Sequence, residues 1–346
     1  MALMSKKIRP VPVTRRWGLR SLALAWIALA WTARADGAAE TLSREAFRIR
    51  DPFVLVDGGT YYLYESKPWN GGKGVGVRTS ADLERWSEKR MAMTLPPEVK
   101  NTAVWAPEVH KYDGAYWLFT TLTFAPDAAH PIRPMLQKGF TGGGLQPRGV
   151  WVFRSESPLG PFRPVKAGGV TPPEWMCLDG TLWVEDGVPW MVFCHEWCQT
   201  GNGRMMAAPM SRDLARFTAE PVELFRAADA PGGGHVTDGP FLIRRKGERA
   251  LRMIWSNFLK GSGYCVLQCV SESGSVRGPW TRHTPLYTRD GGHGMLFNRF
   301  DGALMLSLHQ PNKTPDERMK LFPVAWGDAG LSCAGVEWHA EPEQRK

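Results

Sequence analysis

The sequence of 346 residues lacks several features that define common functional classes. After the first 35 residues, no apolar run reaches the roughly 18 residues that a membrane-spanning helix needs, so we expect no membrane span there. The six cysteines show no spacing typical of a zinc site. The glycine run 232–234 is followed by no helical pattern, which argues against a phosphate-binding loop.

Most of the positive charge belongs to the N-terminal segment. Basic residues precede an apolar run over 22–31, and Ala33-Arg34-Ala35 fits a cleavage site, so residues 1–35 are predicted to be a secretory signal peptide. The protein is therefore expected in the periplasm or outside the cell, and Arg15-Arg16 is compatible with twin-arginine export. Without this segment the formal charge falls from +9 to +2, which removes the main argument for a nucleic-acid partner.

The cysteines leave two interpretations open. An even number in an exported protein permits disulfides, whereas buried cysteines also serve as small apolar side chains. Cys265 and Cys269 lie on one expected strand, too far apart to pair directly. The six are Cys177, Cys194, Cys198, Cys265, Cys269 and Cys333.

Residues 36–346 are rich in strand and turn patterns and show no helical period. The clearest unit is 179–197, where two aromatic and β-branched runs flank Asp186-Gly187, a type I′ turn signal. Similar hairpins begin at residues 51, 106, 238 and 293. A repeat of roughly fifty to sixty residues is typical of propeller blades. We predict an all-β fold, a five-bladed β-propeller that forms a single domain over 36–346.

A second signature follows several of these hairpins. It consists of a turn with a closing aromatic residue, and we expect each copy to lead into an outer strand of its blade. The copies are 82–86, 160–162, 213–217 and 278–280.

Acidic residues stand at one end of the predicted inner strands. Because inner strands surround the axis of a propeller, Asp51, Asp179 and Asp238 are expected at equivalent positions around one pocket, with Glu196 at the same rim and Glu108 pointing the same way. Clustered carboxyl groups raise one another's pKa, so one can stay protonated while another is ionised. This is the requirement for cleaving a glycosidic bond. The simpler reading is that each Asp caps a turn.

Aromatic side chains near these acids are candidates for stacking on sugar rings. The expected substrate-binding residues are Phe53, Trp105, Glu108, Trp197 and His293. The Pro- and Gly-rich stretch 125–149 is long for a loop, and we expect it to influence which sugar is bound.

Five motifs in this order resemble glycoside hydrolase family 43 over roughly residues 48 to 312. They are Arg50-Asp51-Pro52, 105–108, 178–180, Asp238-Gly239-Pro240 and 292–294. The resemblance implies a five-bladed propeller and an inverting hydrolase of arabinose-, xylose- or galactose-containing carbohydrates, and the predicted signal peptide implies that it is exported.

The resemblance also implies roles for single residues. Asp51 matches the general base that activates water, and Asp179 matches the aspartate that orients the acid and tunes its pKa. The family's general acid is a Glu, and Asp238 stands in its place here. Either Asp238 serves as the acid, or Glu196 reaches in from the neighbouring hairpin; Glu196 is favoured because its hairpin brings it beside Asp179.

His293 has two readings in such a fold, contact with the substrate or a water-mediated contact with an ion. No cofactor is expected to be required, and a structural calcium or sodium ion near His293 is the metal site that the resemblance suggests. The expected partner is a carbohydrate, and the protein is expected to be a monomer.

A second function remains open from the sequence, a non-catalytic propeller that binds carbohydrate, because the usual Glu is missing. A retaining fructan hydrolase is disfavoured because Arg50-Asp51 lacks the Asn that precedes its nucleophile.

Overall fold

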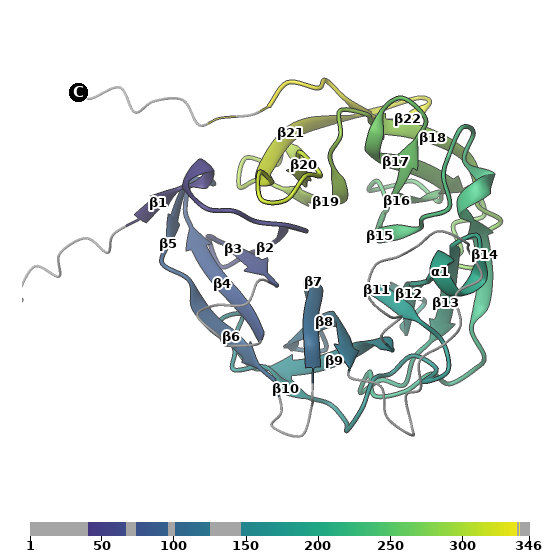
Figure 1. Ribbon diagram of the computed structural model, residues 1–346, viewed down its shortest axis with the longest axis horizontal. Coiled ribbons are helices and arrows are strands. Elements are labelled where there is room, and N and C mark those ends of the chain that lie inside the picture. The colour runs from purple at the N-terminus through teal and green to yellow at the C-terminus, as the bar shows by residue number, and fades with distance from the viewer. Residues whose placement is uncertain (1–40, 67–73, 96–100, 125–146, 338, 340–346) are drawn as a thin grey trace, which may run out of the picture. The chain divides into compact units, whose positions relative to one another are not determined.

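The computed structural model describes residues 41–66, 74–95, 101–124, 147–337 and 339. The predicted signal peptide and nearly all of the stretch 125–149 lie outside the described residues. Five four-stranded sheets surround a common axis, and the predicted five-bladed β-propeller is confirmed (Figure 1). The described strands belong to one compact unit.

Each blade is an antiparallel sheet whose strands follow chain order from the axis outward. Blade 1 holds β2 (Phe53–Asp57), β3 (Thr60–Glu65), β4 (Gly74–Ser80) and β6 (Arg90–Thr94). Blade 2 holds β7 (Asn101–Tyr112), β8 (Ala115–Phe124), β9 (Arg148–Ser155) and β10 (Arg163–Pro164). Blade 3 holds β11 (Cys177–Glu185), β12 (Val188–His195), β13 (Arg204–Pro209) and β14 (Val222–Arg226). Blade 4 holds β15 (Asp238–Ile243), β16 (Leu251–Leu259), β17 (Gly263–Ser271) and β18 (Thr281–Tyr287). Blade 5 holds β19 (Gly292–Asn298), β20 (Leu304–Gln310), β21 (Arg318–Gly327) and β22 (Gly330–Cys333).

The remaining elements are short. Strand β1 (Thr41–Ser43) pairs with β5 (Arg85–Ser87) at the outside of blade 1. The helical turns are η1 (Arg44–Ala46), α1 (Trp197–Thr200) and η2 (Ala227–Asp229). Among the described residues, none of these helices has the length and apolar character needed to cross a membrane.

The inner hairpins form where turn chemistry predicts them. Asp186 and Gly187 have φ angles of 51° and 78°, the left-handed pair that a type I′ turn requires, between Glu185 and Val188. The predicted outer turns are also present; their aromatic rings Trp86, Phe162 and Trp280 are buried, and Phe217 of the remaining turn is half-buried. Local sequence therefore fixes where each strand turns back.

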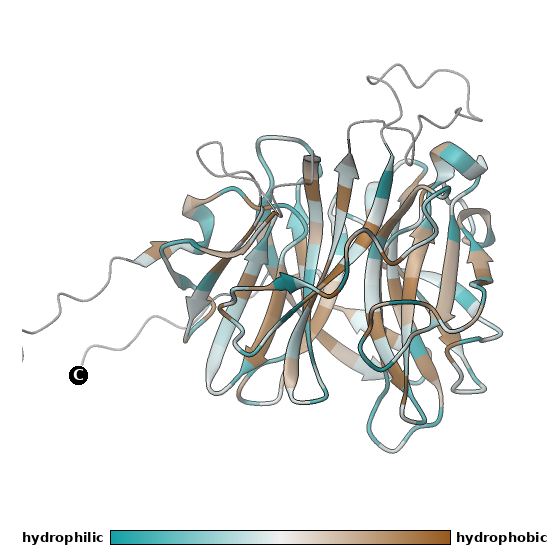
Figure 2. Ribbon diagram, turned by 90° about the horizontal axis from the view of Figure 1, so that it is seen from below, coloured by the Kyte–Doolittle hydropathy of each residue, from teal (hydrophilic) through white to brown (hydrophobic). Residues whose placement is uncertain are grey.

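The core lies between blades. Phe119 of blade 2 and Phe193 of blade 3 belong to one apolar cluster, and Trp255 of blade 4 packs on Phe225 of blade 3 with ring centroids 5.2 Å apart. Figure 2 shows the apolar residues concentrated along the strands and many hydrophilic residues in the connecting loops. Because each blade packs against the blades on both sides, contacts between blades hold the inner strands in place around the axis.

The cysteines are all free thiols, and all but Cys333 are buried. The sequence left open whether the cysteines form disulfides or serve as small apolar side chains, and the structure shows the second arrangement. Cys194 and Cys198 pack against the sulfur atoms of Met205 and Met176, respectively.

Candidate active site

The same backbone kink occurs at or near the start of four inner strands and within β7 in blade 2. One residue per blade adopts the left-handed conformation, which is costly for a residue with a side chain and is often found at functional sites. These residues are Asp51 (φ 52°), Ala106 (40°), Asp179 (54°), Gly239 (49°) and His293 (51°).

In three of the blades a side chain from the preceding blade accepts a hydrogen bond from the N–H of the kinked residue. The pairs are Asp179 with Oγ1 of Thr121 (2.9 Å), Gly239 with Oδ2 of Asp179 (3.0 Å) and His293 with Oγ of Ser256 (2.8 Å). In blade 1 the backbone N of Asp51 lies 3.3 Å from Nδ1 of His309, which also faces the Asp51 carboxylate. These contacts hold the kinks in place and turn the kinked side chains toward one cavity.

Asp238 does not occupy the position equivalent to Asp51 and Asp179, contrary to the expectation. The equivalent residue of blade 4 is Gly239, and Asp238 precedes it in the chain. A side chain at the Gly239 position would have its Cβ 3.0 Å from the His293 ring. Glycine therefore leaves room for His293, and the acid of this blade comes from the residue before it.

A cavity of about 370 Å³ lies over these inner-strand ends. Seven of the predicted site residues line it, namely Asp51, Trp105, Asp179, Glu196, Trp197, Asp238 and His293. The structure thus brings together all four candidate catalytic acids.

Two predicted substrate-binding residues do not line this cavity. Phe53 is 5% exposed and its ring packs against His110 and Phe241. Glu108 is also buried, and its carboxylate lies 3.0 Å from Nε2 of His110. Both lie two residues beyond the kink, where the strand carries their side chains into packing contacts instead of the cavity.

Asp51 is surrounded by cationic or potentially cationic groups. Its Oδ1 lies 3.2 Å from Nδ1 of His309 and 3.6 Å from Nδ1 of His293. Burial alone would raise the pKa of Asp51, but the two histidines and Arg50 outweigh it and hold the pKa well below its usual range. Asp51 is therefore an ionised carboxylate that can accept a proton.

The pKa of Asp179 is shifted in the opposite direction, upward. Burial raises its pKa well above the usual value despite the Gly239 N–H, and the neighbouring acids Asp51, Glu108 and Glu196 add to the rise. Its Oδ2 also lies 3.8 Å from Nδ1 of His293. Asp179 is thus fixed in orientation, and its pKa is raised together with that of its neighbour Asp238.

Asp238 is the acid whose proton is most readily exchanged near neutral pH. Burial, followed by the carboxyl of Asp179, raises its pKa to about 7, while His293 and Tyr264 oppose the rise. The Tyr264 hydroxyl donates a hydrogen bond to Oδ2 at 2.9 Å. A group with this pKa can give up a proton during a reaction and recover it afterwards.

Glu196 caps the short helix α1 at the cavity rim. Its Oε1 accepts a hydrogen bond of 3.1 Å from Arg148, whose guanidinium also lies 5.3 Å from the centre of the Trp105 ring. Burial raises the pKa of Glu196 although Arg148 opposes it. Within the described part of the chain, its buried Oε2 has no hydrogen-bond partner.

The surroundings of His293 do not form a direct metal site. The described residues contain no group of three or more His, Cys, Asp or Glu side chains that could hold a metal ion. An ion near His293 would have to be held through water, and that ion stays a prediction.

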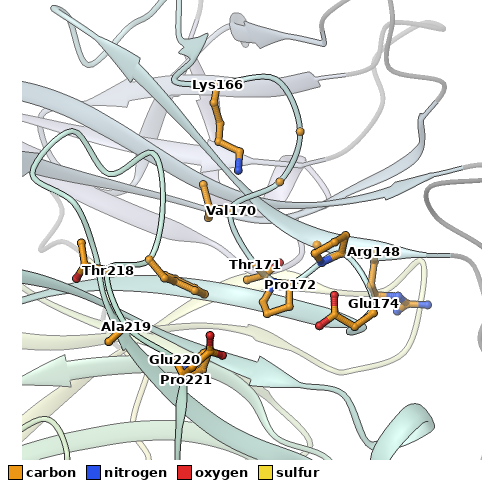
Figure 3. Close-up of a pocket in the computed structure, with 15 residues that line it drawn as sticks. Arg148, Lys166, Val170, Thr171, Pro172, Glu174, Thr218, Ala219, Glu220 and Pro221 are labelled. Atoms are coloured by element: carbon orange, nitrogen blue, oxygen red, sulfur yellow. The ribbon is translucent and has the colours of Figure 1, made fainter.

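Cavity size alone does not identify the active site. A larger cavity of about 590 Å³ lies between the loop 166–174 and the segment 217–221, with Arg148 at its edge (Figure 3). Its acids Glu174 and Glu220 are solvent-exposed. The smaller cavity holds the buried acids, and this concentration of shifted carboxyl groups marks it as the candidate site.

Several contributing residues were not predicted. Tyr264, Phe258, Arg50 and Asn312 line the cavity, and Nε2 of His309 lies 3.1 Å from Oδ1 of Asn312.

One sequence signal could have pointed to the supporting residues. Thr121, Ser256 and His309 pair across the hairpins with Trp105, Asp238 and Gly292. Aligning the second strands of the hairpins would have shown a recurring polar position there.

Comparisons with known proteins show the family of the chain. The family model "Glycosyl hydrolases family 43" matches residues 46–331. A solved structure described as an endo-arabinase from Bacteroides thetaiotaomicron VPI-5482 is 34% identical with a TM-score of 0.73, and the match covers 84% of this chain and 99% of that one.

Two further relatives are more distant. The extracellular endo-alpha-(1->5)-L-arabinanase 1 of Bacillus subtilis (strain 168) is 22% identical over 257 residues, 72% of each chain. An endo-1,4-beta-xylanase structure from Bacteroides thetaiotaomicron VPI-5482 is 23% identical with a TM-score of 0.67, covering 87% of this chain and 98% of that one, and supports the fold. With the family model matching most of the propeller, the chain belongs to glycosyl hydrolase family 43 and is a glycosidase.

Proposed function

We propose that this glycosidase cleaves arabinose- or xylose-containing polysaccharides or oligosaccharides with inversion at the anomeric carbon. The observation that carries the proposal is the pairing of Asp51 and Asp238 in one cavity with opposite protonation tendencies. Carboxyl groups whose pKa values are driven apart are the pattern of a general base and a general acid.

In the proposed reaction, Asp51 accepts a proton from water as the water oxygen attacks the anomeric carbon. The bond from that carbon to the leaving oxygen breaks, and the acid donates its proton to the leaving oxygen. The acid regains a proton from solvent, and Asp51 releases one. Atoms and charges balance without any further reactant.

Asp238 is the favoured proton donor. Its pKa of about 7 keeps much of it protonated at neutral pH, and it opens the Asp-Gly-Pro motif at the family's acid position. Asp179 supports it, because its carboxyl raises the pKa of Asp238 while the Gly239 N–H holds Asp179 in place.

Glu196, the donor favoured from the sequence, is the second candidate. It lines the same cavity, and the Cys198 thiol and Arg148 are the neighbours of its carboxyl group. The Arg148 contact counts against it, because a neighbouring cation favours the ionised carboxylate.

Substrate choice is inferred from relatives and from the cavity lining. Two of the relatives are described as arabinanases, so arabinose polymers are the first substrates to test, followed by xylosides and galactosides. Trp105 and Trp197 line the cavity, and Trp105 is 41% exposed. These indoles are proposed to stack on sugar rings.

Export of the protein is also part of the proposal. It is supported by the basic and apolar pattern of residues 1–35 and by the extracellular B. subtilis relative.

The function is tested with arabinan, xylan and aryl glycosides of α-L-arabinofuranose, β-D-xylose and β-D-galactose. We expect turnover of an arabinose or xylose substrate, with proton NMR showing a first-formed product of inverted configuration. A retained product would contradict the inverting mechanism. Sugar binding without turnover of any substrate would favour the non-catalytic propeller.

The activity should depend asymmetrically on pH. Because the donor works in its protonated form, kcat/KM should fall as the pH rises through about 7, the pKa of Asp238. Because the pKa of Asp51 is depressed, the acidic limb should lie below the pH at which an ordinary aspartate titrates. Measuring kcat/KM from acidic to alkaline pH tests both limbs, and a loss of activity centred near pH 4 would contradict the assignment of Asp51.

A further inference from the structure

We infer that Tyr264 is a positioning residue for the general acid: its hydroxyl holds one oxygen of Asp238 and leaves the other to carry the proton to the leaving group. This inference rests on the proposed role of Asp238. It goes further by assigning a task to a residue of the same blade that lies two strands away from Asp238.

The contact between the two residues is buried and direct. Tyr264 lies near the start of β17, is 3% exposed, and lines the same cavity as Asp238. Its hydroxyl donates to Oδ2 of Asp238 at 2.9 Å. With Oδ2 occupied as an acceptor, the proton of the neutral acid is left to Oδ1.

The Tyr264 ring is confined on several sides. It stacks on the His309 imidazole with centroids 5.7 Å apart and planes 24° apart, and it contacts the Phe258 ring at 5.0 Å. A Cβ at Gly292 would lie 2.3 Å from its Cε1. The glycine therefore makes space for the ring, and the hydroxyl has little freedom to leave Asp238.

The hydroxyl keeps its proton and donates it in the hydrogen bond to Asp238. Burial raises the pKa of Tyr264 well above its usual value, and the nearby acids Asp238, Asp51 and Asp179 add to the rise. During the reaction the proton moves from Oδ1 of Asp238 to the leaving oxygen while Tyr264 keeps its own proton. Its hydrogen bond then strengthens, because Asp238 has become a carboxylate.

The same ring couples the acid to the base. His309, on which Tyr264 stacks, lies 3.2 Å from Oδ1 of Asp51 and is fully buried. The Tyr264 side chain thus contacts the proposed acid, Asp238, and packs on the imidazole beside the proposed base, Asp51. It therefore helps to hold both carboxyl groups in position.

The test is Tyr264→Phe, which keeps the ring and removes the hydroxyl. We expect kcat/KM to fall roughly 10- to 100-fold on substrates with poor leaving groups, and far less on activated aryl glycosides. The basic limb of the pH profile should move to higher pH, because the ionised form of Asp238 loses a donor. The other charged groups near Asp238 are Asp179, Glu196 and His293, and the variant keeps all three.

The matched control is Tyr287→Phe, which removes another buried tyrosine hydroxyl from the adjacent strand β18, away from the cavity. Tyr287 packs on Phe322 between blades 4 and 5, and its variant should have unchanged activity and pH profile.

Two outcomes would overturn the inference. An unmoved basic limb with equal losses on poor and good leaving groups, in a Tyr264→Phe protein that melts like the wild type, would mean that the residue only packs. Full activity of Asp238→Asn would instead show that Asp238 is not the general acid, and Tyr264 could then not be its positioning residue. The first result leaves the proposed function standing, whereas the second does not.

Discussion

Replacing Asp51 by Asn is expected to lower kcat/KM about 10²- to 10⁴-fold, the usual contribution of a general base. The amide has nearly the same shape as the carboxylate, so the cavity and the kink at φ 52° should survive, while the ability to take a proton from water is lost. Steady-state kinetics on the best substrate of the panel measure the effect. Added azide should restore turnover and give a glycosyl azide of inverted configuration, because azide attacks without needing a base.

Asp186→Asn provides a matched control. Asp186 also adopts a left-handed conformation, φ 51°, but it lies exposed in the turn of the blade 3 hairpin. Its variant should keep wild-type activity. If Asp51→Asn retained activity as well, the base would have to be another group.

Replacing Asp238 by Asn is expected to cause a loss of similar size, about 10²- to 10⁴-fold, but only where the leaving group needs protonation. Substrates with dinitrophenyl leaving groups should be cleaved nearly as fast as by the wild type, because a stable phenolate departs without a proton. Comparing kcat/KM across aryl glycosides of different leaving-group pKa measures this dependence. Asp238→Asn should also lose the fall in activity through about pH 7 that reports its own titration.

The parallel variant Glu196→Gln discriminates between the two candidate acids. If Asp238 is the donor, Glu196→Gln should show no special dependence on the leaving group. The reverse pattern, with a steep dependence in Glu196→Gln alone, would transfer the role of acid to Glu196. It would also mean that Arg148 holds the acid in place instead of holding it ionised.

The sequence by itself determined the repeated architecture. Each blade starts with a hairpin whose strand propensities and turn residues are local, as in 179–197 with its turn at Asp186-Gly187. The outer turns carry equally local signals, such as the buried Trp86 and Trp280. Local signals repeated five times sufficed because each blade is one supersecondary unit. The residues that line the axis then followed from the order of the hairpins.

The tertiary structure decided which side chains meet in the cavity. Asp238 lines the cavity although it precedes the kinked residue of its strand, whereas Phe53 and Glu108, two residues beyond their kinks, are buried against other side chains. The partners that set the protonation tendencies come from distant parts of the chain: His309 reaches Asp51 from the neighbouring blade, and Tyr264 reaches Asp238 across its own sheet. Aligning the hairpins shows that a polar residue recurs at the His309 position, but the partner of such a residue is set only once the ring has closed and brought the inner strands to a common axis.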